Sequence, residues 1–196
     1  MCRSLRLLPL LAAALLTACA GTTALRDEAA VIRSSTDDLS HWFVLEARFS
    51  VTSGEERHAG RLFWRHAADG DLMRLMSPLG TVVAEIDLTP GLARLRTADR
   101  QIVEAADATS LIRRVIGIAL PIDRLADWVR ARPAEFSTVE RDAAGRPRLI
   151  REEAWRISYE YGESGDGASE RLPVRLVAAQ EGGPELRLRI ENWELP

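Results

Sequence analysis

Lysine is absent from this sequence of 196 residues, cysteine occurs twice and histidine three times. Every one of the 26 cationic residues is therefore an arginine, and 29 acidic residues give a formal net charge of −3. A protein that binds nucleic acid would carry a basic excess or a basic stripe. The composition therefore argues against that class.

Catalytic and metal-binding patterns are missing as well. No His-Glu-x-x-His helix or Gly-x-Ser-x-Gly elbow occurs, and the glycines of residues 162–170 lack the Lys-Ser/Thr that a phosphate loop needs. His58 and His66 share strand parity but lie roughly 26 Å apart along an extended strand, so we interpret them as solvated residues and not as a metal pair. Glu152 and Glu153 stand among arginines, as ordinary solvated charges do. We expect no enzyme, no metal site and no cofactor.

The chain has no apolar run long enough to span a membrane, but a shorter run lies near its start. Arg3 and Arg6 precede the mostly apolar residues 7–16, which fall far short of the ~20 residues that a spanning helix needs. Small residues then lead to a cysteine in Leu16-Thr17-Ala18-Cys19. A basic start, a short apolar core and small residues at a cleavage site are typical of a secretory signal peptide. The sequence therefore predicts cleavage before Cys19.

The same cysteine indicates a lipid anchor. Leu-Thr-Ala-Cys resembles the lipobox of bacterial lipoproteins and lies where a cleavage site must lie; the alternative is an ordinary secreted protein with a chance cysteine. We expect residues 1–18 to be a signal peptide, residues 19–24 a lipidated tether and residues 25–196 a single domain. Loss of two leader arginines leaves 24 against 29 acidic residues, a net charge of −5. Lipidation of Cys19 would leave no thiol for a disulfide or a nucleophile.

Hydrophobic periodicity predicts a chain made mostly of strands. A spacing of three and four residues predicts one helix over residues 25–41, and alternation with period two predicts strands after it. The predicted strands are 43–51, 58–65, 72–76, 82–88, 92–97, 101–105, 135–140, 146–151, 155–161, 172–178 and 186–193.

Two short helices are predicted between the sixth and the seventh strand. Asp107 is a candidate N-cap for a helix over 108–116, and Gly117 is its candidate end. Pro121 is well suited to open the second helix, because its fixed φ fits the first turn. The apolar side of that helix carries Leu125, Trp128 and Val129.

Short links and one-sided alternation favour antiparallel pairing, and a sheet of that many strands tends to curl. We therefore expect a mainly β (α+β) fold: an open antiparallel β-barrel of about eleven strands with a helical lid and an apolar cavity. A solid core is the alternative, since the same inward side chains could fill the interior. Parity alone selects the candidate cavity lining, although a register slip would reverse any strand. These residues are Leu45, Phe49, Leu62, Trp64, Val82, Ile86, Ile157 and Leu188.

One turn has an apolar tip. Turns normally offer polar residues to water, yet in Ser77-Pro78-Leu79-Gly80 a leucine lies between proline and glycine. Leu79 could fold back onto the core, or it could be one of the single exposed leucines that are common on proteins.

Several motifs together resemble the LolB family, the outer-membrane receptors of the bacterial lipoprotein sorting pathway. The resemblance runs through nearly the whole mature chain and rests on the order and spacing of fragments that follow the lipobox. The fragments are Leu45-x-Ala47-Arg48-Phe49-Ser50-Val51, Leu62-x-Trp64, Ser77-Pro78-Leu79-Gly80-Thr81, Leu120-Pro121-Ile122-x-x-Leu125-x-x-Trp128-Val129, Trp155-x-Ile157-x-Tyr159 and Ile190-x-Asn192-Trp193. Three positions where the family pattern has glycine carry a methyl group, which excludes some backbone conformations. They are Ala47, Ala131 and Ala154.

The resemblance implies a transport role in which no bond is made or broken. Such proteins take the acyl chains of client lipoproteins from the periplasmic carrier LolA and release the lipoprotein into the inner leaflet of the outer membrane. The implied partners are LolA, client lipoproteins and outer-membrane phospholipid, with no nucleic acid and a monomeric state. No cofactor is implied beyond the covalent lipid on Cys19 and the transient acyl chains. Pro78, Leu79 and Gly80 are implied to form the membrane-insertion loop.

Location and energetics agree with this role. In families that sort lipoproteins this way, aspartate after the lipidated cysteine commonly signals retention in the inner membrane, whereas this chain has Ala20, so we expect the outer membrane, facing the periplasm. Exposing an acyl chain of roughly 16 carbons to water would cost on the order of 13 kcal/mol, so such chains need shelter in the periplasm.

One alternative function is that of another periplasmic lipid- or ligand-binding lipoprotein without a delivery role. Another is a structural lipoprotein with a filled β core.

Overall fold

Eleven strands form one antiparallel sheet in the computed structural model, which describes residues 42–162 and 171–196. The predicted signal peptide, Cys19, the tether and the predicted helix over 25–41 lie outside the described residues, and so does most of the loop at 162–170. Among the described residues, no helix is both long and apolar enough to cross a membrane.

The strands follow the predicted order along the chain. Before the helices lie β1 (Trp42–Ser53), β2 (Glu56–Ala67), β3 (Gly70–Met76), β4 (Val82–Thr89), β5 (Leu92–Thr97) and β6 (Ile102–Ala105). Helices α2 (Ala108–Ile116) and α3 (Ile122–Val129) follow. The chain then continues with β7 (Thr138–Arg141), β8 (Pro147–Glu152), β9 (Trp155–Tyr161), β10 (Pro173–Gln180) and β11 (Glu185–Glu194). The expected antiparallel strands with one helical interruption are confirmed.

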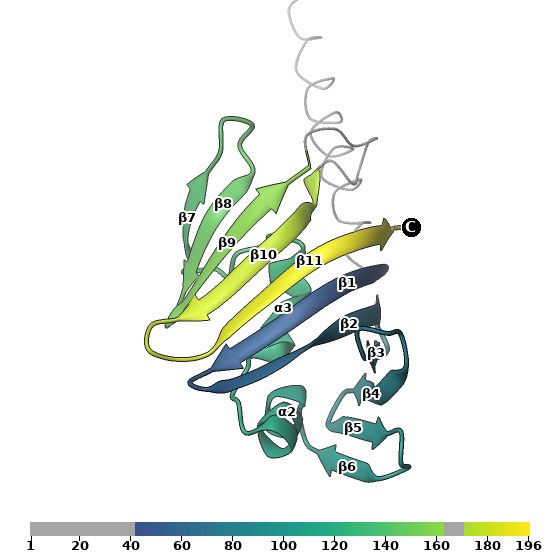
Figure 1. The fold of residues 1–196 in the computed structure, drawn as a ribbon. Coiled ribbons are helices and arrows are strands. Elements are labelled where there is room, and N and C mark those ends of the chain that lie inside the picture. Colours follow the sequence, from purple (N-terminus) through teal and green to yellow (C-terminus); the bar gives the residue numbers. More distant parts are fainter. Residues whose placement is uncertain (1–41, 163–170) are drawn as a thin grey trace, which may run out of the picture. The chain divides into compact units, whose positions relative to one another are not determined.

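The first and the last strand join two meanders into one sheet. The spatial order is β6-β5-β4-β3-β2-β1-β11-β10-β9-β8-β7, so β1 lies in the middle between β2 and β11. Phe49 of β1 pairs with Gly60 on one side and with Leu188 on the other. Strands β6 and β7 follow one another in the order of strands along the chain, with the two helices between them, but they form opposite edges of the sheet. They do not pair with each other, so the sheet is open (Figure 1).

Antiparallel pairing gathers the links at two ends of the sheet. The links β1–β2, β3–β4, β5–β6, β8–β9 and β10–β11 share one end, and the first residue of β7 lies there too because Thr138 pairs with Arg151. We call this the Leu79 end, after the residue in the β3–β4 link. The links β2–β3, β4–β5 and β7–β8 lie at the opposite end.

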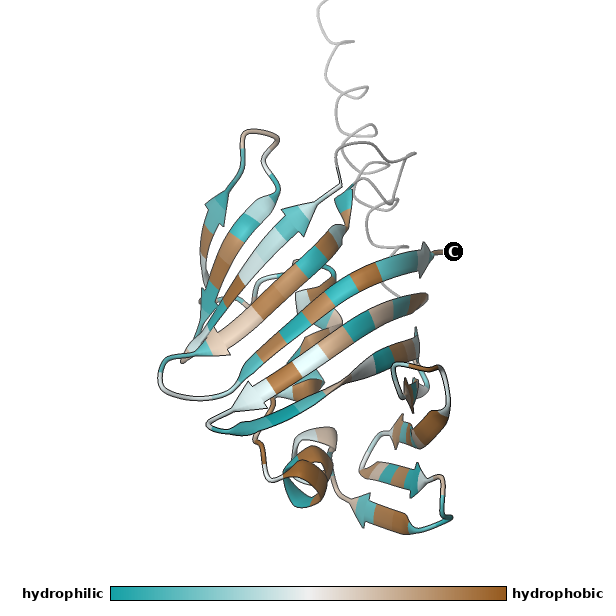
Figure 2. Ribbon diagram, in the orientation of Figure 1, coloured by the Kyte–Doolittle hydropathy of each residue, from teal (hydrophilic) through white to brown (hydrophobic). Residues whose placement is uncertain are grey.

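Alternation along the strands separates an apolar inner face from a polar outer face. In β9, every second residue from Trp155 to Tyr159 is buried, and in β11 the same holds from Leu186 to Ile190. Hydrophobic and hydrophilic segments alternate visibly along β11 and β1 (Figure 2). Both helices lie on the concave side of the sheet (Figure 1), where the Trp128 ring of α3 lies 5.4 Å from that of Trp155.

The helix limits match those predicted from the capping residues. A carboxylate oxygen of Asp107 accepts a hydrogen bond from the Ser110 backbone N–H at 2.6 Å, which satisfies one of the free donors at the start of α2. At the other end, Gly117 has a φ of 73°, and its N–H donates to the Arg113 carbonyl. Helix α3 buries the expected Leu125, Trp128 and Val129.

Three described residues other than glycine have left-handed backbone conformations: Arg100 in the β5–β6 link, Ala131 and Glu153. Ala131, one of the three alanines where the family pattern has glycine, has a φ of 54°, and its N–H donates to the Trp128 carbonyl as α3 ends. Glu153 has a φ of 52° in the two-residue β8–β9 turn. Each such conformation costs about 1–2 kcal/mol for a residue with a Cβ.

Candidate functional site

An apolar cavity of about 480 Å³ lies between the inner face of the sheet and the two helices. Its strand side comes from β1 to β5 and β11, and its helix side comes from α2, the link after it and α3. This volume is typical of cavities that take small ligands. The expected cavity is therefore present, and the solid-core alternative is wrong.

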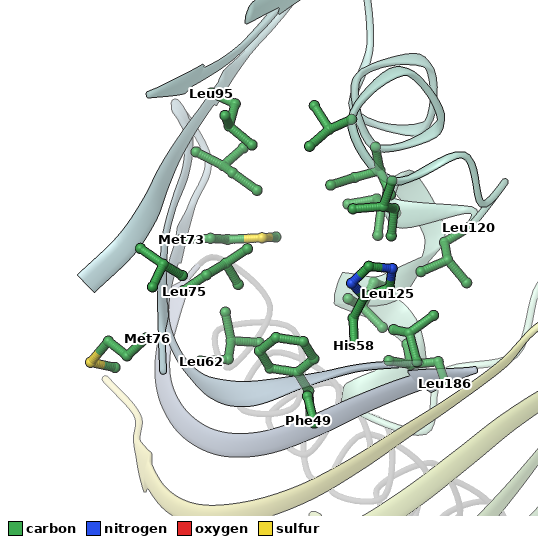
Figure 3. Close-up of a pocket in the computed structure, with 18 of the residues that line it drawn as sticks. Phe49, His58, Leu62, Met73, Leu75, Met76, Leu95, Leu120, Leu125 and Leu186 are labelled. Atoms are coloured by element: carbon green, nitrogen blue, oxygen red, sulfur yellow. The ribbon is translucent and has the colours of Figure 1, made fainter. Parts of the chain in front are cut away.

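The strand side is built of large apolar side chains that point toward the helices. Leu62, Met73, Leu75 and Leu95 face Leu120 and Leu125 across the cavity (Figure 3). In β11 the lining residues Leu186 and Leu188 follow the alternation of side chains between the two faces. The lining from β2 does not, because the consecutive residues 57–59 all border the cavity.

Phe49 covers a place where β2 carries no side chain. A Cβ at Gly60 would lie 2.4 Å from the Met76 carbonyl oxygen and 3.1 Å from the Phe49 ring. Glycine at this position therefore lets β3 approach β2 closely and lets the aromatic ring lie against the sheet.

The helix side is a single face of α2. Its lining residues recur at intervals of three and four, which places them on one side of the helix. They are Ala108, Leu111, Ile112, Val115 and Ile116. Ile122 and Leu125 of α3 continue the wall.

Four of the eight predicted lining residues line this cavity: Phe49, Leu62, Ile86 and Leu188. Leu45, Trp64 and Ile157 are buried and face inward but do not line this cavity, and Trp64 borders a neighbouring pocket of about 390 Å³ instead. Parity identified the inner face for these three, yet it could not distinguish the hollow part of the interior from the filled part. Binding of acyl chains to the cavity stays a prediction.

The assignment of Val82 to the lining is wrong. The next residue, Val83, lines the cavity instead, although the two valines are about equally exposed at 44% and 45%. The pairing register between β3 and β4 shifts where Met76 pairs with Val82 and Leu75 pairs with Ala84. This β-bulge gives Val83 no partner on β3 and breaks the alternation at the start of β4. Because residues 82 and 83 are both valine, the hydrophobic pattern could not show which of them faces the interior, and so it could not reveal the bulge.

The Leu79 loop borders the cavity, because Ser77 and Pro78 belong to its lining. The side chain of Leu79 is 95% exposed, so the folded-back alternative is wrong. The loop is closed by hydrogen bonds from the Gly80 N–H to the Ser77 carbonyl at 2.9 Å and from the Ser77 N–H to the Thr81 carbonyl at 2.8 Å. Gly80 has a φ of 88°, which a residue with a Cβ would adopt only with strain. Backbone geometry thus holds the leucine outward.

The histidines differ from expectation in one case. His58 lies on the cavity wall and is exposed, whereas the His66 side chain is only 18% exposed. His66 Nδ1 lies 2.7 Å from an Asp71 oxygen that also accepts a hydrogen bond from Trp64 Nε1, and the His66 ring packs against Phe43 at 4.8 Å. Contacts from β1 and β3 cover His66, and its own strand could not reveal them. Among the described residues, no group of three or more His, Cys, Asp or Glu side chains could hold a metal ion.

Glu152 is a structural residue that the sequence interpretation missed, since it is buried and not solvated. Arg124 of α3 donates to its carboxylate through Nε at 2.6 Å and Nη2 at 3.2 Å. The Ala134 N–H and the Ser137 hydroxyl donate to the same carboxylate, each at 3.3 Å. Burial would raise the pKa of Glu152, but the hydrogen bonds and the charge of Arg124 outweigh it, and the pKa lies below its ordinary value. Its parity with the buried Ile150 was the available signal.

Strand β7 begins later than the sequence predicted. The strand expected over 135–140 begins at Thr138, because the preceding residues form a turn in which the Ser137 N–H donates to the Ala134 carbonyl at 3.1 Å.

Comparison with known sequences gives one family. The family model described as outer membrane lipoprotein LolB matches residues 41–193. The chain is 40% identical over 194 residues to the outer-membrane lipoprotein LolB of an Azoarcus species, which covers 98% of this chain and 96% of that protein. It is 38% identical over 157 residues to the outer-membrane lipoprotein LolB of Dechloromonas aromatica, covering 78% and 81% of the two chains.

Solved structures with the same fold are distant in sequence. A LolA superfamily protein from Nitrosomonas europaea matches with a TM-score of 0.52 at 12% identity, covering 86% of this chain and 93% of that one. A putative outer membrane lipoprotein-sorting protein domain from Vibrio parahaemolyticus matches with a TM-score of 0.53 at 10% identity, covering 86% and 91%. At this identity the two matches show a shared fold.

Proposed function

Because the chain belongs to the LolB family of outer membrane lipoproteins, we propose that its apolar cavity shelters the acyl chains of client lipoproteins during their transfer to the outer membrane. Its role is lipoprotein localisation at that membrane. In the proposed sequence, the chain accepts the client from the carrier LolA and releases it into the inner leaflet. The observation that carries the proposal is the cavity itself, which is lined almost entirely by aliphatic and aromatic side chains.

The chemistry of the cavity suits an acyl chain. Each methylene removed from water contributes about 0.8 kcal/mol, and the cavity offers no charged group beyond Arg57 at its lining that could select a polar ligand. Nothing in this arrangement requires a covalent step. The direction of transfer then follows from affinity: the client moves from a weaker cavity to a stronger one and finally to the bilayer.

Helix α2 is the element that controls access in this proposal. One of its faces lines the cavity, while Thr109 on another face donates a hydrogen bond to Asp123 of α3 at 2.9 Å. Arg114 donates to the Glu104 carbonyl of β6 at 2.7 Å. Because these polar contacts are few, α2 can yield as long acyl chains enter.

The Leu79 loop supports the delivery step. An exposed leucine on a closed turn that borders the cavity can enter the lipid surface while the client leaves the cavity. Proline and glycine on either side keep its position relative to the cavity fixed.

The anchor completes the proposal. Cys19 carries the lipid after signal peptidase cleavage, the chain acts as a monomer, and the outer-membrane phospholipid is its final partner. The N-terminal mass of the protein purified from membranes tests this point, because a mature start other than a lipidated Cys19 would contradict it.

The test of the proposed function is a transfer assay with Leu79→Glu. We expect the variant to fold and to take a client lipoprotein from a LolA–lipoprotein complex, but to fail in passing it to liposomes. Because the side chain is exposed, its stability should stay within about 0.5 kcal/mol of the wild type. Leu92→Glu, at a leucine that is 37% exposed at the opposite end of the sheet, is the control and should deliver normally. Normal delivery by a folded Leu79→Glu would refute the role and leave a lipid-binding lipoprotein without delivery.

A further inference from the structure

A second large apolar side chain is as exposed as Leu79. Phe136, in the link between α3 and β7, is 94% exposed, whereas the next most exposed large hydrophobic residue of the described chain, Ile102, is 59% exposed. Removing a phenylalanine side chain from water is favourable, but single exposed apolar side chains are common. The exposure of Phe136 therefore gains its meaning from the rigid support beneath it and from its position relative to Leu79.

The link around Phe136 is held in place by the core. The residues on both sides of it, Ala134 and Ser137, donate hydrogen bonds to the buried carboxylate of Glu152, and the Ser137 N–H closes the turn onto the Ala134 carbonyl. Arg124 fixes that carboxylate from α3. The side chain at the tip of this turn therefore points away from a rigid support.

Phe136 and Leu79 lie at the same end of the sheet. The β3–β4 link that carries Leu79 is at the Leu79 end, and Phe136 immediately precedes the start of β7, where Thr138 pairs with Arg151 beside the β8–β9 turn. The cavity also reaches this end, since Ser77, Pro78 and Leu186 belong to its lining.

We propose that Phe136 is a second membrane contact, so that the Leu79 end of the sheet meets the bilayer at two points. The inference rests on the proposed function, in which Leu79 enters the lipid surface during delivery. Two separated contacts fix how the cavity faces the membrane, whereas one contact leaves the protein free to pivot.

A lipid surface suits Phe136 better than a protein partner. The residues directly before and after it, Glu135 and Ser137, are polar, and no other large apolar residue lies between Arg132 and Thr138. A stable protein interface buries about 800 Å² on each partner around a dehydrated centre, which an isolated tip does not offer. A bilayer accepts a single aromatic side chain among polar residues at its interface. A chain of an outer membrane lipoprotein family works with such a surface within reach.

The test places a nitroxide probe at single introduced cysteines in the full lipidated protein reconstituted in phospholipid vesicles. The variants are Phe136→Cys, Leu79→Cys and, as the control at the opposite end, Asp69→Cys in the exposed β2–β3 turn. Protein without an introduced cysteine is the blank and should take up no probe, because Cys2 leaves with the signal peptide and the sulfur of Cys19 carries the lipid. Collision rates with oxygen, which concentrates in lipid, and with a water-soluble nickel chelate report the surroundings of each probe.

We expect the ratio of oxygen to nickel collisions to rise several-fold at positions 136 and 79 relative to position 69. A probe at 136 that stays in water while the probe at 79 is in lipid would overturn this inference and leave the proposed function standing. Water at both positions would overturn both. Shielding at 136 that requires added carrier protein would overturn the lipid contact, because it would assign the residue to a protein partner.

A functional measurement complements the probes. Phe136→Ser should slow delivery of the client to liposomes while leaving acceptance from the carrier unchanged, and Phe136→Trp should restore the rate. Equal delivery by Phe136→Ser and wild type would contradict the contact.

Discussion

At the scale of single residues, Glu152 connects three parts of the molecule. Its carboxylate binds Arg124 of α3 and two donors of the α3–β7 link, while its own backbone belongs to β8. Hydrogen bonds to an ionised group are roughly twice as strong as neutral ones, and a buried charge without such partners would be costly. The folded state therefore depends on this carboxylate being charged.

This dependence predicts the effect of Glu152→Gln. The free energy of unfolding should fall by about 2 kcal/mol at pH 7, because the amide cannot replace the charge that Arg124 requires. The pKa of Glu152 lies below its ordinary 4.5 in the folded state, so the stability it contributes is present above pH 4.5 and is lost as the pH falls through the lowered value. Denaturant unfolding at several pH values should therefore show the stabilities of the two proteins converging as the pH falls below 4.5.

Glu140 of β7 supplies the control for that comparison. It pairs with Arg148 and Arg151 on the exposed outer face, so Glu140→Gln should change stability much less. Equal losses for the two variants, or a gap at Glu152 that does not narrow in acid, would contradict the account.

The sequence predicted the face on which a side chain lies where the period of the strand alone determines it. The prediction failed where the partner strand determines it. Parity placed Phe49, Leu62, Ile86 and Leu188 on the inner face, and they line the cavity. The bulge that turns Val82 outward depends on the partner strand, and the sequence of β4 alone carries no trace of it.

At the scale of elements, α2 is defined by its own ends. The Asp107 side chain caps its start and Gly117 ends it, which is why the sequence predicted both limits. Capping is a local effect and can be read along the chain. The pairing of β1 with β11 is different, because alternation shows which face of a strand is buried and does not show which distant strand lies beside it.

The end of α2 gives a prediction at this scale. A Cβ at Gly117 would meet nothing within 4 Å, so the cost of Gly117→Ala comes from its φ of 73° alone. We expect a loss of about 1 kcal/mol, seen as a fall in melting temperature of roughly 2–4 °C.

The matched control is Gly117→Asn, since asparagine tolerates the left-handed region. It should lose clearly less stability than the alanine variant. Equal losses for both would mean that the link after α2 does not depend on this conformation.

At the scale of the whole described unit, β6 and β7 are the two edge strands and do not pair, so the sheet stays open. The two helices that connect them cover the inner face of the sheet and leave a cavity beneath. The sequence predicted this architecture from strand number and from the position of the helical insertion. It could not predict where the interior is hollow, because Leu45 and Ile157 share the pattern of Phe49 and Leu188 yet pack solidly. That division depends on how α2 and α3 rest on the curved sheet.

The central claim is that acyl chains occupy this cavity, and two phenylalanines on adjoining strands test it. Phe49 lines the cavity, whereas Phe63 of β2 lies on the other face, where the guanidinium of Arg74 is 5.8 Å from its ring. Each is replaced in turn by photoreactive benzoyl-phenylalanine, and the protein is irradiated after it has received a client lipoprotein from the carrier. The account predicts cross-links from position 49 to the acylated N-terminus of the client and none from position 63. Absence of cross-links at position 49, or equal cross-linking from both positions, would contradict it.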